Sequence, residues 1–519
     1  MNINSFIKDL GFKKSLRILA NTLISIYTLV FIYFFAVGPV DSSFLGIRIR
    51  VQDLVNPLLI LSFAVALRIA VAITWNKKRI FDIIILSLSS VMALGAMEVL
   101  IRARYPEEMQ PIQYIYNETV SNRDNDRGPY TEGPAKPGVT RIMVQGDSVT
   151  WGMGVRDWKD LYPNKLLEEL NRDSATYDMQ VWAVPGMQVD FHAKVLAHSG
   201  RQTAPDIIVY QWYVNDVEIW AGRPDQAKNP PVWQKFWTHP YLIGRSLLYR
   251  FVESRMATLL YQDGVSYARY MEEEVVPGKR NWWYFEQEFH KWATYANSIA
   301  KRTIMMTFPS LPYKGEYPFA KVTNSVIALT RPHMMKIPVA YLPKREGVEE
   351  RGLGGVFEEA RVARRGVAGP GHIAFGPYMP MPEGGHKAVF NAMLLGPAQQ
   401  EAKVALLEIA SGEGKNILAS MVLKGGDFGS PGQWKSFPLS FNVEGGMAED
   451  VEFRIEWFGQ ADMAVDTIDV AVDYRIEVVN PMEELNTFNT HATLFDAHPN
   501  ARAHGVMAQA LARQILRQP

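Results

Sequence analysis

The sequence has 519 residues, of which 48% are hydrophobic and 12% aromatic. This length predicts two or more domains, and the apolar content excludes a mostly disordered chain. The 54 Lys and Arg residues balance 54 Asp and Glu residues, so the basic excess typical of a dedicated nucleic-acid-binding protein is absent. There is no cysteine, which excludes disulfides, thiolate zinc sites, iron–sulfur clusters and a cysteine nucleophile.

Apolar stretches near the N-terminus predict a membrane anchor over residues 1–104, with about three transmembrane helices at 18–40, 54–76 and 80–101. The first stretch contains no charged residue, and a helix of that length crosses a hydrocarbon layer of ~30 Å. A cleaved signal peptide is the alternative. Its apolar core would be shorter, and Pro39 makes the small residues before it a poor cleavage site.

Charged residues orient these predicted spans. Arg68 interrupts the second stretch, while Asp82 and Glu98 lie near the ends of the third. Lys and Arg cluster before the first span and at 77–79, and basic loops face the cytoplasm. The sequence therefore predicts a multi-pass protein of the cytoplasmic (inner) membrane, with everything beyond the anchor on the periplasmic or extracellular side.

The pattern changes after the third stretch to that of a soluble α/β protein. Residues 105–139 are polar and rich in Pro and Gly, which is typical of a linker. Short apolar runs then alternate with helical patterns, and this alternation predicts a parallel sheet. The expected strands begin near Arg141 and span Met179–Val184, Asp206–Trp212 and Arg302–Phe308, with helices at Tyr162–Asn171 and 284–300.

Three residues follow the ends of three of these strands. Ser148 comes after the first strand in a Gly-rich turn, Gly186 after the second and Asn215 after the third. Ligand sites of parallel sheets lie beyond the carboxyl ends of the strands. The three residues are therefore expected to converge at one edge. Near the C-terminus, Asp496 and His498 precede a helix and fit a loop at the same edge.

These residues resemble the sequence blocks of the SGNH, or GDSL-like, serine hydrolases. Gly146-Asp147-Ser148 matches the first block, Gly186 the second, Asn215-Asp216 the third, and Asp496 with His498 the last, over roughly residues 140–310 and 480–517. Tyr213 stands where the third block usually has glycine, and the last block has Asp-x-His spacing instead of Asp-x-x-His. The resemblance implies a flavodoxin-like, three-layer α/β fold.

The resemblance also implies a catalytic site. Ser148 would be the nucleophile, His498 the base and Asp496 the residue that orients the imidazole. The Ser148 and Gly186 N–H groups and the Asn215 amide would form the oxyanion hole. The alternatives are a simple turn serine at 148, and His491 or His504 as the base. The histidines show no metal-ligand spacing, so we expect no metal and no cofactor.

Residues 335–480 carry a different pattern. Apolar residues recur with period two at Val451, Phe453, Ile455 and Trp457, which predicts strands. We expect an inserted, jelly-roll-like β-sandwich that divides the catalytic domain into 140–334 and 481–519. The run 375–385 resembles carbohydrate-binding modules found beside glycan enzymes. A purely structural insert is the alternative.

Location and resemblance together predict a membrane-anchored serine esterase acting on O-acyl groups, O-acetyl groups foremost, of cell-surface or exopolysaccharide glycans. One alternative is an O-acetyltransferase of the same glycans at the same site, which would work with a membrane partner protein. The second is a non-catalytic glycan-binding or assembly subunit. The expected partners are thus the membrane and a glycan or acylated sugar, and no nucleic acid.

Overall fold

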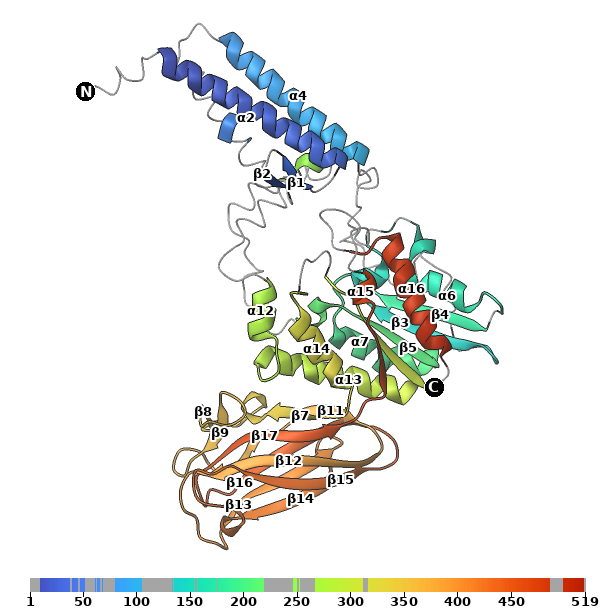
Figure 1. Cartoon of the computed structure of the whole chain (residues 1–519). Helices are drawn as coiled ribbons and strands as arrows, with labels where there is room; N and C mark the ends of the chain where they lie inside the picture. The colour runs from blue at the N-terminus through green and yellow to red at the C-terminus, as the bar shows by residue number, and fades with distance from the viewer. Residues whose placement is uncertain are drawn as a thin grey trace, which may run out of the picture. The chain divides into compact units, whose positions relative to one another are not determined.

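The computed structural model describes residues 10–37, 40–44, 47–51, 80–104, 135–218 except 154, 156 and 175, 246–249, 267–310, 316–485 and 498–517, with isolated residues between these ranges. The chain forms two compact units. The first unit comprises Met1–Asn117 and Asn229–Asp263, and the second comprises Glu118–Lys228 and Gly264–Pro519. Figure 1 shows the elements of both units.

The first unit contains two long helices and a hairpin: α2 (Leu10–Val37), α4 (Ile80–Arg104), β1 (Val40–Phe44) and β2 (Ile47–Val51). Glu98 of α4 holds a distant part of the chain. Its carboxylate accepts hydrogen bonds from the Leu247 and Leu248 N–H groups, at 3.1 and 2.9 Å, and from the Arg102 side chain at 2.5 Å. Burial opposes its ionisation, but these donors keep the pKa of Glu98 below its usual value.

The prediction of transmembrane helices is wrong. Crossing a membrane requires about 20 consecutive apolar residues, and no helix in the described ranges has both the length and the apolar character for this. The predicted span 80–101 instead carries Glu98, engaged in the polar contacts above, and most of 54–76 lies outside the described residues. The predicted location as a multi-pass protein of the cytoplasmic membrane depended on these spans, so it is wrong as well.

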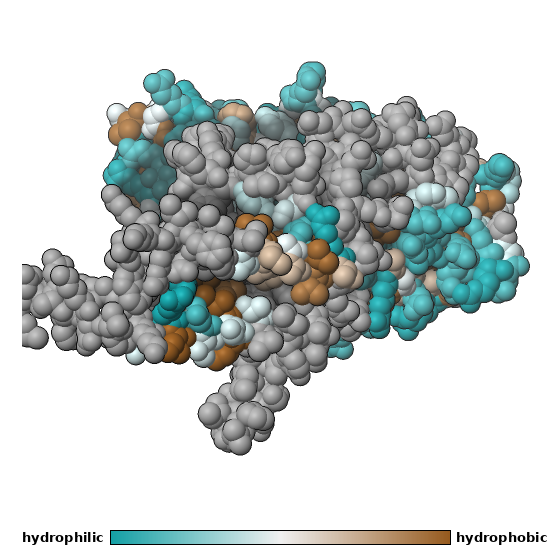
Figure 2. Space-filling view, turned by 90° about the horizontal axis from the view of Figure 1, so that it is seen from above, coloured by the Kyte–Doolittle hydropathy of each residue, from teal (hydrophilic) through white to brown (hydrophobic). Residues whose placement is uncertain are grey.

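Large apolar side chains are nevertheless exposed on both helices of the first unit. They are Ile18, Leu19 and Ile26 on α2 and Val91, Met92, Leu94, Val99 and Leu100 on α4. On the face of the molecule drawn in Figure 2, brown hydrophobic residues occur in small groups beside teal hydrophilic ones.

A five-stranded parallel sheet forms the centre of the α/β part of the second unit. Its strand order is β18-β6-β5-β3-β4. The strands are β3 (Thr140–Gly146), β4 (Tyr177–Ala183), β5 (Ile207–Trp212), β6 (Arg302–Thr307) and β18 (Ile476–Val479). The predicted parallel sheet is therefore present, and β18 joins it from the end of the stretch that the sequence pattern assigned to the insert.

Helices cover both faces of this sheet. On β3, Ile142 and Val144 pack with α6 (Tyr162–Leu170) and α16 (Ala501–Leu516). The intervening Met143 belongs to the cluster that contains α7 (Val189–Val195) and α13 (Arg280–Ile299). Alternate residues of a strand face opposite sides, so this burial defines three layers. The other helical segments of this part are α5 (Ser148–Trp151), η3 (Trp158–Asp160), η4 (Leu196–Gly200), α8 (Arg201–Thr203), η5 (Val214–Val217), α12 (Tyr267–Glu274), α14 (Ala320–Leu329) and α15 (Met482–Leu485).

The aromatic residues near the third strand serve packing where they are described. Trp212, Trp282 and Trp283 are buried, and all three belong to the core on the α7 and α13 side. The Tyr210 and Trp292 rings also meet there, with centroids 4.7 Å apart. Trp220, Trp233 and Trp237 lie outside the described residues.

Two antiparallel sheets lie between β6 and β18 in the chain. One has the order β10-β16-β13-β14 with β11 beside β16, and the other β15-β12-β17-β9-β8 with β7 beside β17. Phe453 of β16 contacts Phe390 of β12 and Phe441 of β15, with ring centroids 6.4 and 6.3 Å apart, so the sheets share a core. The strands are β7 (His333–Pro338), β8 (Glu349–Arg351), β9 (Ala360–Ala363), β10 (Gly371–Ala374), β11 (Pro377–Met381), β12 (Gly384–Leu394), β13 (Lys403–Ser411), β14 (Asn416–Lys424), β15 (Lys435–Val443), β16 (Ala448–Trp457) and β17 (Met463–Val472), with short helical segments η8 (Val339–Tyr341) and η9 (Gly425–Asp427).

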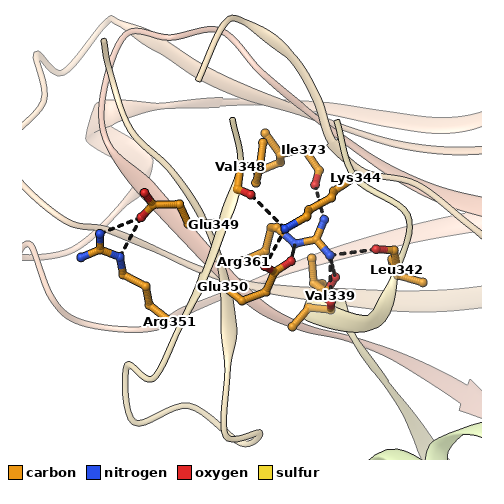
Figure 3. Close-up of polar contacts among 10 residues, drawn as sticks. Val339, Leu342, Lys344, Val348, Glu349, Glu350, Arg351, Arg361 and Ile373 are labelled. Atoms are coloured by element: carbon orange, nitrogen blue, oxygen red, sulfur yellow. Dashed lines mark hydrogen bonds and ion pairs between the residues drawn. The ribbon is translucent and has the colours of Figure 1, made fainter. Parts of the chain in front are cut away.

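A buried arginine fixes the segment that leads into the sandwich. The Arg361 guanidinium is fully buried and donates hydrogen bonds of 2.8 to 2.9 Å to the carbonyl oxygens of Ile373, Val339, Ala340 and Leu342 (Figure 3). Glu350 lies 3.3 Å from its Nε. Burial lowers the pKa of Arg361, but a guanidinium stays protonated in proteins. The side chain thus joins β9, β10 and the turn after β7.

Candidate functional site

The first site residues come from the turn that follows β3. Asp147 caps the single-turn helix α5 (Ser148–Trp151), and its carboxylate accepts a 2.9 Å hydrogen bond from the Val149 N–H. A short polar side chain at this position satisfies an N–H group that the helix leaves unpaired. The cap places Ser148 at the first position of the helix, at the carboxyl end of a buried strand.

Glycine is required at the last position of β3. A Cβ on Gly146 would lie 1.9 Å from Thr150 Oγ1 and 2.8 Å from Gln211 Oε1, closer than any real contact. The Thr150 hydroxyl itself donates to Gln211 Oε1 at 2.9 Å and lies 2.9 Å from the Tyr162 hydroxyl. This buried network holds the Ser148 turn against β5 and α6.

Ser148 and His498 meet in the structure although 350 positions separate them in the chain. Ser148 Oγ lies 2.8 Å from His498 Nε2. The hydroxyl is also 3.4 Å from Asp147 Oδ2, a much longer contact, so the imidazole is the better acceptor of its proton. His498 stands just before α16, whose N-cap Asn500 accepts hydrogen bonds from the Arg502 and Ala503 N–H groups.

Gly186 and Asn215 follow the neighbouring strands, as predicted. Gly186 has φ +77°, a conformation that favours glycine, and an added Cβ would meet no atom within 4 Å. The Asn215 side chain opposes the rise in the pKa of the Asp147 carboxyl, so the third strand end lies close to the Ser148 turn. Within the described residues, the Ser148 and Gly186 N–H groups donate no hydrogen bond. Both remain able to donate to a substrate oxygen.

Gln188 connects the two turns that carry Gly186 and Asn215. This side chain is buried, and its amide donates to the Glu218 carbonyl and, at 3.5 Å, to the Asn215 carbonyl. The contact joins the segment after β4 to the turn after β5. Gln188 therefore fixes the spacing of two of the predicted oxyanion donors.

Two buried carboxyl groups, of Asp147 and Asp216, lie close to each other by the Ser148 turn. Asp216 Oδ2 accepts hydrogen bonds of 2.9 Å from the Tyr210 hydroxyl and the Tyr213 N–H. Burial, followed by the nearby Asp147 charge, raises the pKa of Asp216 well above its usual value. Burial also raises the pKa of Asp147, but the Val149 N–H, His498, Asn215 and Ser148 oppose this rise. Asp147 is thus the carboxyl group better placed to stay ionised.

The remaining predicted site residues divide into described and undescribed positions. His504, the alternative base, is buried against Tyr162, and its Nδ1 accepts a 3.0 Å hydrogen bond from the Tyr162 N–H. Burial lowers the pKa of His504 to about 3, so it packs α16 against α6 as a neutral ring. Asp496 and His491 lie outside the described residues. Among the described residues no group of three or more His, Asp or Glu side chains could hold a metal.

Several polar residues of this site were not singled out from the sequence. Gln145 and Gln211 lie near the carboxyl ends of buried strands. Gln145 accepts a 2.9 Å hydrogen bond from Trp292 Nε1 and donates to the His192 carbonyl, while Gln211 accepts from Thr150. A polar residue near the end of a buried strand was the available signal, because a buried amide needs partners. Gln188 has no comparable sequence signal.

The arrangement suits acyl transfer. A serine hydroxyl becomes a nucleophile when a base accepts its proton, and His498 Nε2 lies within reach of that proton. A tetrahedral intermediate of such a reaction needs donors directed at its oxyanion, and the Ser148 and Gly186 N–H groups lie in the turns after the neighbouring strands β3 and β4.

Comparisons with known proteins give likeness over part of the chain. No family model matches the sequence, and no curated protein matches it. Among solved structures, the C-terminal CBM6 of a marine laminarinase from Zobellia galactanivorans is 12% identical, with 27% of this chain and 100% of that chain covered and a TM-score of 0.21. A carbohydrate-binding module of Cellvibrio mixtus lichenase 5A is 10% identical, with 27% and 97% covered and a TM-score of 0.20. A β-1,3-glucan-binding CBM6 from Bacillus halodurans is 12% identical, with 27% and 94% covered and a TM-score of 0.20.

Proposed function

We propose that the chain is a serine esterase, with Ser148 as the nucleophile and His498 as the general base. The observation that supports this proposal is the 2.8 Å contact between Ser148 Oγ and His498 Nε2 at the carboxyl edge of the parallel sheet. A structural serine at a helix start would have no need of an imidazole from the far end of the chain. Asp496 is proposed to orient His498, as the resemblance to SGNH hydrolases implies.

The proposed reaction runs in two steps. His498 accepts the Ser148 proton while Oγ attacks the ester carbonyl, and the imidazolium then protonates the leaving alcohol. Water next attacks the acyl-enzyme with His498 again as base, which releases the acid and regenerates Ser148. The Ser148 and Gly186 N–H groups and the Asn215 amide hold the oxyanion in both steps. The proposed substrate is an O-acyl, foremost O-acetyl, group on a glycan.

Transfer to a sugar hydroxyl is the variant of this chemistry that uses the same residues, because water and an alcohol can both attack the acyl-enzyme. A non-catalytic glycan-binding role is the second candidate function. The antiparallel sandwich favours this role. None of its described residues belongs to the Ser148 turn, so a function of the sandwich would be separate from the proposed reaction.

Hydrolysis of 4-nitrophenyl acetate by the purified chain tests the proposal. Ser148→Ala and His498→Ala should each lower kcat/KM by at least about 10³-fold, and the double variant should lose little more, because the two residues act as a unit. Ser420→Ala and His198→Ala, at exposed positions away from this turn, are matched controls that should retain activity. Mass spectrometry after rapid mixing should find the acetyl group on the Ser148 peptide.

The proposal is wrong if the folded wild-type chain hydrolyses no acetyl ester, or if Ser148→Ala retains its turnover. The absence of turnover together with binding of a glycan would favour the non-catalytic role. Acetyl transfer to an added oligosaccharide, measured against acetate release, separates the transferase from the esterase.

A further inference from the structure

A cleft of about 1090 Å³ lies between α13 and one end of the sandwich. His290 and Asn297 of α13 line one side, and His333, His386, Lys387 and Arg475 come from β7, β12 and the segment before β18. The volume is slightly above the range of about 300–1,000 Å³ that is typical of small-molecule sites. Both parts of the second unit thus contribute to one concave surface.

The cleft lies at the sheet edge opposite the Ser148 turn. Arg475 directly precedes β18, which runs parallel to β6 from its first residues, so this end of the cleft adjoins the amino ends of the strands. Ser148 follows the carboxyl end of β3. A ligand in the cleft therefore leaves the proposed reaction site uncovered.

Fixed side chains form part of the cleft wall. His290 Nε2 lies 2.8 Å from the Pro380 carbonyl and its Nδ1 lies 2.6 Å from the Tyr474 hydroxyl. A neutral ring that donates through Nε2 and accepts through Nδ1 satisfies both contacts, and it leaves no ring nitrogen for a metal. His386 similarly lies 2.8 Å from the Pro382 carbonyl and packs on Phe441, with ring centroids 5.2 Å apart.

Four charged side chains of the cleft have no partner of their own. Glu383, Lys387, Asp473 and Arg475 are exposed, and within the described ranges their side chains make no hydrogen bond or ion pair. Three exposed lysines elsewhere in the sandwich are paired: Lys344 with Glu350 at 2.6 Å, Lys415 with Glu413 at 2.9 Å and Lys424 with Glu401 at 2.6 Å. The cleft therefore presents two cations and two carboxylates that can still bond to a ligand.

These groups select one class of ligand. Two positive and two negative side chains give no net charge, so neither a polyanion nor a polycation is favoured. Donors and acceptors are both offered, which suits hydroxyl groups, because each hydroxyl carries one donor and two acceptor positions. Met334, 43% exposed, adds apolar surface for a face of C–H groups. We propose that this cleft binds a neutral oligosaccharide segment.

This second site goes beyond the proposed esterase and does not depend on it. Binding at the amino edge would hold a polymer while acyl groups further along it reach Ser148 at the carboxyl edge. Binding in the cleft would then raise the effective concentration of a polymer's acyl groups at Ser148, whereas a small ester would show no such increase.

Calorimetric titration of the full chain carrying Ser148→Ala tests the proposal without turnover. The probes are cellotetraose, laminaritetraose and xylotetraose as neutral oligosaccharides and trigalacturonate as an acidic one. At least one neutral probe should bind. Lys387→Ala with Arg475→Ala should weaken that binding by at least about tenfold, the effect expected for losing a charge-assisted hydrogen bond. Gly385→Phe, at a position where a Cβ meets no atom within 4 Å, should weaken it by obstructing the cleft.

Lys424→Ala is the matched control, since it removes an exposed lysine, paired with Glu401, from the end of the sandwich opposite the cleft. It should leave the affinity unchanged, and the cleft substitutions made in the wild-type chain should leave hydrolysis of 4-nitrophenyl acetate unchanged. Failure of every neutral probe to bind, binding of the acidic probe alone, or equal affinity of all variants would overturn the cleft proposal. None of these results bears on the esterase, whose failure shows as absent ester turnover or as turnover retained by Ser148→Ala.

Discussion

Replacing Gly186 with alanine separates its role in the fold from its proposed role in the reaction. Gly186 has φ +77°, and an added Cβ would meet no atom within 4 Å. Gly445, in the turn between β15 and β16, has the same φ of +77° and the same open surroundings. The two alanine substitutions therefore impose the same backbone strain on the same molecule, far from each other in the sequence.

The expected loss of folding stability is small, and the expected loss of reaction rate is large. A left-handed conformation costs an alanine about 1–2 kcal/mol, and no clash adds to this at either position. A domain of ordinary stability, about 5–15 kcal/mol, stays folded after such a loss. The Gly186 N–H is a proposed oxyanion donor, and the methyl group would stand beside it. Loss of one such donor typically lowers the rate by about 10²–10³-fold.

Urea unfolding and hydrolysis of 4-nitrophenyl acetate measure the two effects. Gly186→Ala and Gly445→Ala should lose similar free energies of unfolding, and only Gly186→Ala should lose kcat, by about two to three orders of magnitude. Equal activity of the two variants would show that the Gly186 N–H does not bind the oxyanion. A large activity loss in Gly445→Ala would show that strain alone accounts for the effect.

Three further predictions concern buried polar side chains. Burial lowers the pKa of His192 to about 3, and neither ring nitrogen has a partner among the described residues. As the pH falls, the His192 imidazole is therefore protonated in the unfolded chain before it is protonated in the folded one. The free energy of unfolding should fall by about 1.4 kcal/mol per pH unit from pH ~6.5 towards 3. His192→Phe should reduce that slope with little change at neutral pH, as acid denaturation would show. Arg361→Met should cost about 3–5 kcal/mol in urea unfolding, because four carbonyl groups lose their donor; an unchanged midpoint would contradict this. Gln188→Met should lower kcat about tenfold at nearly constant KM, because the donor turns lose their fixed spacing; normal kcat would remove Gln188 from the site.

The parallel sheet could be predicted because its signals are local. Each strand is a short apolar run, and each run is followed by turn residues of the kinds Gly, Asp, Asn or Pro. The direction of the strands then brings Ser148, Gly186 and Asn215 to one edge without any knowledge of packing. The contact of Ser148 with His498 followed from the resemblance, since no local pattern links positions so far apart.

The parts that could not be predicted depend on contacts between distant residues. The 80–101 stretch is apolar by composition, but hydropathy does not show that Glu98 binds the backbone at 247 and 248. Residues 476–479 belong to the stretch whose pattern predicts the insert, yet they pair in parallel with β6 at the edge of the α/β sheet. Glu477 there forms a two-point contact of 2.8 Å with Arg302, a partner that only the folded sheet reveals.

The register of β7 and β17 explains how so large an insert leaves the α/β sheet intact. His333 begins β7, Val472 ends β17, and the two residues are paired opposite each other. Residues opposite each other in antiparallel strands lie about 5 Å apart. The first and last strands of the sandwich therefore bring the two ends of the insert close together. The length of the insert does not increase the distance that the chain must span between α14 and β18. This closure lets β18 take its place beside β6. The α16 helix then packs on α6, and His498 comes within hydrogen-bonding distance of Ser148.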